Sequence, residues 1–175
     1  MKGWLTVICV CICALWAIPT QATVWHWNNI PIDGLQETPP VATPGTGLGT
    51  ASLNTVTKIM MISGSYSGLT GTANNAHLHG PAPPGTPAGV IFGLSFTAST
   101  AGTFNGTSGV LPAATITNIL NGLSYINIHS TFKTGGEIRG QLQNPIQIPE
   151  PTGVLLLSVG ASSLFAFGRR RRFST

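Results

Sequence analysis

The chain has 175 residues, only 7% of them charged, and a formal net charge of +4. Between residues 23 and 148 the charges balance, three basic against three acidic: Lys58, Lys133 and Arg139 against Asp33, Glu37 and Glu137. Most of the positive charge therefore belongs to the two ends of the chain. A neutral central region without a basic patch excludes a nucleic-acid-binding surface.

Residues 1–22 have the pattern of a secretory signal peptide. Lys2 precedes an apolar stretch from Trp4 to Ile18, and the small residue Ala22 ends the segment. The stretch is short for an uncleaved membrane anchor, which needs about 20 residues. We therefore expect export through the Sec translocon and cleavage by signal peptidase after Ala22. All three cysteines precede this site, so the mature domain has no disulfide to stabilise it.

Residues 23–143 are predicted to form one all-β domain. Short segments rich in Val, Ile, Thr and aromatic residues alternate with clusters of Gly, Pro and Asn. This spacing predicts an antiparallel β-sandwich or Greek-key barrel, of the immunoglobulin or superoxide dismutase type. We expect strands over 24–30, 49–53, 58–66, 73–79, 90–96, 102–104, 107–111, 124–130 and 137–143.

The turns and the single helix follow from local signals in the same region. Asn105-Gly106 has the chemistry of a tight hairpin turn between two strands. Residues 113–121 have one apolar face and Gly122 as a C-terminal cap, which predicts a helix. Residues 38–47 and 80–89 are proline-rich and are expected to be loops.

Two tryptophans near the start of the domain allow two interpretations. In a strand, Trp25 and Trp27 point to one face and His26 to the other. The pair belongs either to the buried core or to an exposed aromatic platform for sugar rings. The second interpretation predicts a carbohydrate-binding surface module.

A histidine pair is the strongest candidate for chemistry. His77 and His79 point to the same face of a strand, and His129 lies on the polar face of a later strand with Tyr125 and Asn127. Neutral imidazole is a ligand for copper or zinc, so these three histidines predict a metal site. The alternatives are a structural network of hydrogen bonds and a site for another ligand.

The surroundings of this site are predicted by the same alternation. Glu137, Arg139 and Gln141 share one face of the last strand, and Ile138 enters the core. Glu137, Arg139, Asn127 and Tyr125 would then support the metal ligands from behind. The chain has no phosphate-binding glycine loop, and Tyr66 stands where a nucleophile elbow needs serine. These absences favour a non-enzymatic role.

The C-terminal end has three parts in order. Residues 144–151 are a proline-rich linker that ends in Pro149-Glu150-Pro151, residues 152–168 are uncharged, and residues 169–175 begin with four arginines. The uncharged part predicts a transmembrane helix about 26 Å long. The arginines place the tail 169–175 in the cytoplasm by the positive-inside rule.

This tail resembles the PEP-CTERM sorting signal of Gram-negative bacteria. The resemblance implies recognition by exosortase, removal of the tail near Pro149-Glu150-Pro151, and release to the cell surface or the extracellular matrix. It also implies transient insertion of 152–168 in the inner membrane and exopolysaccharide or other matrix components as partners.

The central region resembles the CHRD domain, which is named after chordin. Five segments carry the resemblance in order: Ile32 to Val41, Ser67 to Thr70, His77 to Pro81, Tyr125 to His129 and Gly135 to Gln141. It implies an extracellular domain with a structural or binding role. The His77-Leu78-His79 strand is also similar to the copper-ligand strand of copper/zinc superoxide dismutases. The cysteine pair and zinc subloop of those enzymes are missing here, which argues against dismutase activity.

Overall fold

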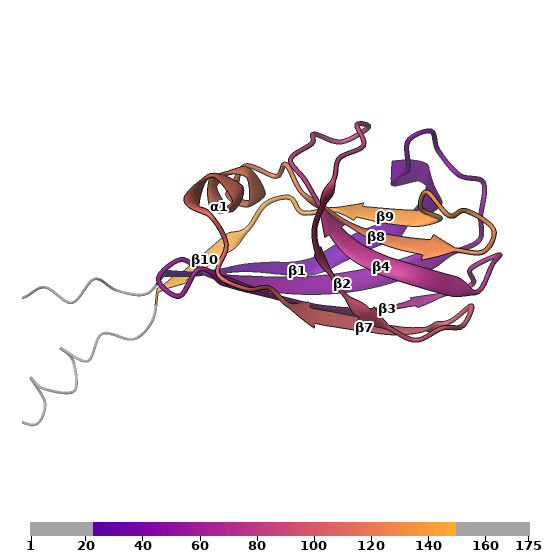
Figure 1. The fold of residues 1–175 in the computed structure, drawn as a ribbon, viewed down its shortest axis with the longest axis horizontal. Helices are drawn as coiled ribbons and strands as arrows, with labels where there is room; N and C mark the ends of the chain where they lie inside the picture. The colour runs from indigo at the N-terminus through magenta and orange to yellow at the C-terminus, as the bar shows by residue number, and fades with distance from the viewer. Residues whose placement is uncertain (1–22, 150–175) are drawn as a thin grey trace, which may run out of the picture.

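The computed structural model describes residues 23–149, which form an all-β domain with one short helix (Figure 1). The predicted signal peptide with its predicted cleavage site at Ala22, and the predicted span and basic tail beyond residue 149, lie outside the described residues. Within the described part no helix is long and apolar enough to cross a membrane.

Ten strands belong to one antiparallel sheet. In chain order they are β1 (Thr23–Asp33), β2 (Thr46–Asn54), β3 (Ile59–Ser67), β4 (Ala73–His79), β5 (Val90–Gly93), β6 (Ser95–Phe96), β7 (Gly102–Thr107), β8 (Tyr125–Ser130), β9 (Ile138–Gln141) and β10 (Ile146–Pro149). A 3-10 helix η1 (Gly34–Gln36) follows β1, and helix α1 (Ala113–Leu120) precedes β8.

The sheet curves until its two edges nearly meet. Its order is β5-β4-β8-β9-β1-β2-β3-β7-β6, with β10 paired to the first half of β1. Strands β5 and β6 are consecutive in the chain, and between them the Leu94 N–H donates to the Ala76 carbonyl of β4 at 2.8 Å. The segment 90–96 thus joins β4 to β7, and the prediction of a barrel-like all-β domain is confirmed.

Alternating side chains fill the interior of this barrel. On β3, Met60, Ile62 and Tyr66 are buried, while Met61, Ser63 and Ser65 face outward. Strand β8 places Ile126 and Ile128 in the same core. Each large apolar side chain that is fully buried contributes about 1.5–3 kcal/mol, which is how a domain without disulfides is held together.

Strand β7 corrects the predicted hairpin at Asn105-Gly106. The pairing of β7 with β3 runs without interruption from Gly102 to Thr107, and neither residue has the positive φ that such a turn needs. A Cβ on Gly106 would lie 2.6 Å from the Leu94 side chain, so this glycine permits close packing. The strand predicted over 107–111 is also wrong, because β7 ends at Thr107.

Strand β10 corrects the predicted linker. Residues 146–149 pair with β1 from Thr23↔Pro149 to His26↔Ile146 instead of forming an unstructured connection. The first and last described residues therefore lie side by side, at one end of the barrel (Figure 1).

Helix α1 confirms the prediction over 113–121 to within one residue. Ile116 and Ile119 are buried, and Leu120 packs partly against the core. Gly122 follows with a φ of 74°, and its N–H donates to the Ile119 carbonyl. A residue without a side chain is favoured in this left-handed conformation.

Candidate metal centre

The three predicted histidines lie on neighbouring strands. Strands β4 and β8 pair antiparallel, with His77 opposite Asn127, His79 opposite Tyr125 and Asn75 opposite His129. Because Leu78 and Ile126 point into the core, the histidines project from the outer face of the barrel wall.

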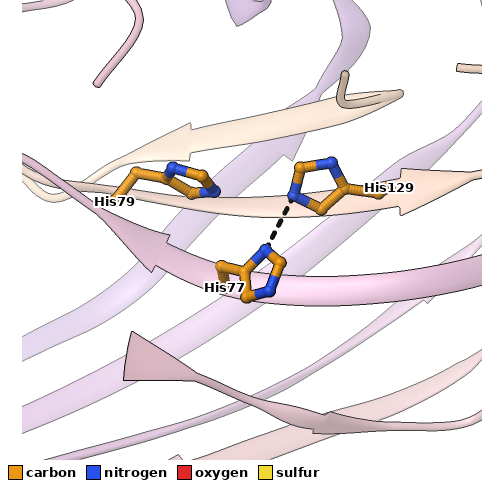
Figure 2. A group of neighbouring side chains, drawn as sticks. All are labelled: His77, His79 and His129. Carbon is orange, nitrogen blue, oxygen red and sulfur yellow. Dashed lines mark hydrogen bonds between the residues drawn. The ribbon is translucent and has the colours of Figure 1, made fainter. Parts of the chain in front are cut away.

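The imidazole rings converge in space. His77 Nδ1 lies 3.0 Å from His129 Nε2, and one ligand nitrogen from each of the three rings lies within 4.8 Å of the others (Figure 2). The ring centroids of His77 and His79 are 5.4 Å apart, and those of His79 and His129 are 5.6 Å apart. His79 and His129 are buried, while His77 is half-buried and gives the cluster access to solvent.

Backbone carbonyl groups fix the orientation of two of the rings. His79 Nδ1 lies 2.9 Å from the Ala88 carbonyl, and His129 Nδ1 lies 2.9 Å from the Thr134 carbonyl. A carbonyl only accepts, so each Nδ1 carries the proton and each Nε2 carries an acceptor lone pair, which in His129 lies 3.0 Å from His77 Nδ1. His79 Nε2 is buried and has no hydrogen-bond partner. This arrangement is the one that metal-binding histidines commonly have.

The rings are neutral around pH 7. Burial lowers the pKa of His77, and the neighbouring His79 lowers it further. Burial also lowers the pKa values of His79 and His129 below the usual value, although the hydrogen bonds to Ala88 and Thr134 offset part of the effect. Neutral imidazole is the form that binds metal ions.

Tyr125 and Arg139 support His79 from behind. The Tyr125 ring stacks on His79 at a centroid distance of 5.1 Å and an angle of 7° between the ring planes. The Arg139 guanidinium carbon lies 3.5 Å from the centre of the same tyrosine ring, which is a cation–π contact. The Tyr125 hydroxyl also accepts a hydrogen bond from the Ala88 N–H, the residue whose carbonyl orients His79.

Arg139 also holds the loop that covers the site. Its guanidinium donates to the carbonyls of Thr86 and Pro83 at 2.9 and 3.2 Å, and to the Gln141 side chain at 2.7 Å. Thr86 and Pro83 belong to the loop 80–89, which was predicted as a proline-rich loop and which supplies Ala88. Arg139 is 1% exposed, so these contacts hold a buried cation.

Glu137 serves a different part of the molecule. Its carboxylate accepts hydrogen bonds from the Thr43 hydroxyl at 2.5 Å, from the N–H groups of Thr70 and Gly71, and from the Ser130 hydroxyl. Burial alone would raise the pKa of Glu137, but these four bonds together outweigh it and hold the pKa below the usual range. Glu137 thus ties three loops together, and none of its hydrogen bonds goes to a histidine.

Glu37 also lies near the site, beside Asn127 and Arg139, and no pattern in the sequence predicted this position. Glu37 Oε1 and Asn127 Oδ1 are buried without a hydrogen-bond partner, and both lie 2.5 Å from the point where a Cβ on Gly136 would be. Burial raises the pKa of Glu37 to about 7, while the Arg139 charge and hydrogen bonds from Thr38 and Asn127 oppose the change. The carbonyls of Ala88 and Thr134 were likewise not predictable, because backbone groups have no residue signature.

The tryptophans do not form the aromatic platform that one interpretation predicted. Trp27 is 1% exposed and belongs to the core, and Trp25 is half-buried and packs against the core. The buried Trp27 ring cannot stack on a sugar, so the two rings do not form a shared platform. The interpretation of the tryptophans as core residues is confirmed for Trp27.

Comparison with known proteins assigns the family. The CHRD domain family matches residues 29–142, which is more than half of the chain and nearly all of the described domain. No curated protein and no solved structure matches the chain. The match includes the histidine strands, the Pro-rich loops and the buried Arg139. The chain therefore belongs to the CHRD domain family.

Proposed function

We propose that this chain is an exported CHRD-domain protein that holds a copper or zinc ion through His77, His79 and His129 at the cell surface or in the extracellular matrix. One observation carries the proposal: three imidazole nitrogens lie within 4.8 Å of one another, and backbone carbonyls orient two of the rings.

The donor set and its spacing support a transition metal. Two nitrogens that each lie about 2.1 Å from a tetrahedral metal are about 3.4 Å apart, so small rotations of the rings suffice to bind an ion. In the present arrangement His77 Nδ1 donates a hydrogen bond to His129 Nε2. A metal ion placed between these rings would replace that hydrogen. Imidazole donors suit copper and zinc better than magnesium or calcium.

A binding role agrees better with the surroundings than catalysis of a hydrolytic reaction. Within the described residues, the hydrogen-bond partners of the three imidazoles are two backbone carbonyls and one another. No hydroxyl or carboxylate is held by a histidine as a nucleophile or a general base would be. We therefore assign the ion a structural or carrier role within a non-enzymatic domain.

The location follows from the two ends of the sequence. The signal peptide pattern over 1–22 and the sorting pattern from Pro149 onward support export, exosortase processing and release. Thr23 pairs with Pro149, so both segments leave the domain at the same end. A membrane-held intermediate would therefore have the rest of the barrel free outside the membrane.

Elemental analysis of the purified protein tests the metal site. The full chain is expected to retain about one copper or zinc ion after dialysis, and His79→Ala should lose most of it because a three-donor site keeps only two donors. His26→Ala is the matched control, since His26 lies on β1 outside the cluster. Retention of the full metal content by His79→Ala, with an unchanged circular dichroism spectrum, would refute the site.

Processing of the tail tests the location. In a host with exosortase, a tag placed after Thr175 should be separated from the body of the protein, and replacement of Glu150 by alanine should leave both on one membrane-bound chain. A host that lacks exosortase should give the same unprocessed product. Equal processing in both hosts would contradict sorting by exosortase and would leave the metal site unaffected.

A further inference from the structure

The charges around the three imidazoles distinguish metal ions of different valence. This inference rests on the proposed metal site and concerns which ion the site selects. His77, His79 and His129 are all neutral donors, so the bound ion keeps its full charge unless another group compensates it.

The acidic side chains of the described domain are engaged elsewhere. Asp33 accepts hydrogen bonds from the N–H groups of Leu35 and Gln36 at the start of η1. Glu137 is saturated by its four donors, none of which is a histidine. Glu37 lies nearest Asn127 and Arg139, and burial keeps much of it protonated at neutral pH. Residues 23–149 contain no cysteine, so no thiolate supplies negative charge either.

A buried cation lies behind the site instead. Arg139 contacts the Tyr125 ring, and that ring stacks on His79. All of the hydrogen bonds from the guanidinium go to uncharged oxygens, those of Thr86, Pro83 and Gln141. Within the described residues Glu37 is the acidic group whose charge acts on Arg139, and it is only partly ionised at neutral pH, so Arg139 keeps a net positive charge behind the site.

This environment penalises a divalent ion more than a monovalent one. The repulsion from Arg139 is proportional to the charge of the ion, and the cost of desolvating the ion grows with the square of that charge. Zinc(II) at three histidines also needs a water or hydroxide as its fourth ligand. Copper(I) is monovalent, so both penalties are smaller for it, and imidazole is among the donors that suit copper.

We propose that the three-histidine site selects copper(I) over zinc(II) and copper(II). The selectivity comes from the neutral donor set and from the Arg139 cation behind Tyr125. The site would then serve an exported protein as a holder of reduced copper.

Competition with chelators tests the selectivity on the full chain purified in detergent. Cys9, Cys11 and Cys13 are replaced by serine, so that thiolates of any uncleaved signal peptide do not bind copper(I). The chain should bind one copper(I) at least about tenfold more tightly than zinc(II) or copper(II). Equal or tighter binding of a divalent ion would overturn the inference and leave the proposed metal site intact. Absence of binding for all three ions would overturn both.

A single isosteric substitution tests the cause. On β8, Asn127 pairs with His77 of β4 on one side and with Arg139 of β9 on the other. Asn127→Asp therefore places one negative charge between these two residues. It should lower the preference for copper(I) over zinc(II) by about tenfold or more. Asn28→Asp makes the same change at an exposed position of β1, which β8 and β9 separate from β4, and should leave the preference unchanged. An unchanged preference in Asn127→Asp would refute the electrostatic cause.

Discussion

Replacement of Glu37 by glutamine should stabilise the domain at neutral and alkaline pH. Glu37 is 8% exposed, and its Oε1 is a buried acceptor without a hydrogen-bond partner. A proton on the carboxyl, or the uncharged amide of glutamine, removes the negative charge that burial disfavours. Only the ionised carboxylate is left with the full cost of burial.

The magnitude follows from the change in pKa. The pKa of Glu37 is about 7 in the folded protein, against about 4.5 in the unfolded chain. Between these values the unfolded state releases a proton that the folded state retains, so the free energy of unfolding falls as pH rises. At about 1.4 kcal/mol per pH unit, the loss between pH 4.5 and pH 7 is about 3 kcal/mol. Below pH 4.5 Glu37 contributes no such loss.

The difference in the free energy of unfolding between wild type and Glu37→Gln is measured by urea unfolding at several pH values between 4 and 8. Unfolding is followed by the fluorescence of buried Trp27. Comparison of the two chains removes the contribution of all other titrating groups. The stability of the glutamine variant relative to wild type should increase across this range and level off above pH 7. A difference that stays constant from pH 4 to pH 8 would refute the assignment of a buried, proton-retaining Glu37.

Three further substitutions test other parts of the structure. Glu137→Gln should destabilise the domain by about 2–4 kcal/mol at pH 7, because four donors lose a charged acceptor. The pKa of Glu137 is lowered in the folded protein, so the wild type should lose this advantage as pH falls below about 4.5. Equal acid sensitivity of both chains would contradict this account. Arg139→Lys should weaken copper binding by about tenfold if the planar fork positions the Ala88 loop and Tyr125, and unchanged affinity would disprove a positioning role. Gly64→Ala should lower the free energy of unfolding by about 1–3 kcal/mol, because a Cβ there meets the Phe104 ring and the Leu48 carbonyl; thermal unfolding of a fully stable variant would contradict this packing.

The faces of the strands were predictable because one side of each strand points into the core and the other side points outward. Ile126 and Ile128 alternate with Tyr125, Asn127 and His129. Because side chains along a strand alternate between its two faces, His129 must point away from the core, whatever the position of the strand in the sheet. The same rule placed His77 and His79 together. Both predictions depend only on neighbours along the chain, so they needed no knowledge of the tertiary structure.

Features that depend on distant parts of the chain were not predictable in this way. Gly106 resembles a turn residue, but the Leu94 side chain from another strand explains it. Residues 146–149 resemble a linker, but the free edge of β1 receives them as a strand. In both cases a long-range contact decided between two local conformations of similar free energy.

By itself the sequence determined that a neutral, cysteine-free β domain lies between two segments with patterns that predict targeting, and that it has two histidines on one face of a strand. Only the tertiary structure decided that β8 lies beside β4, which brings His129 within 3.0 Å of His77. It also decided that Ala88 and Thr134 orient two rings, that Glu137 ties loops together, and that Arg139 lies behind Tyr125. The physical reason is that alternation along a strand fixes the direction of a side chain, whereas strand order and loop closure fix what it meets.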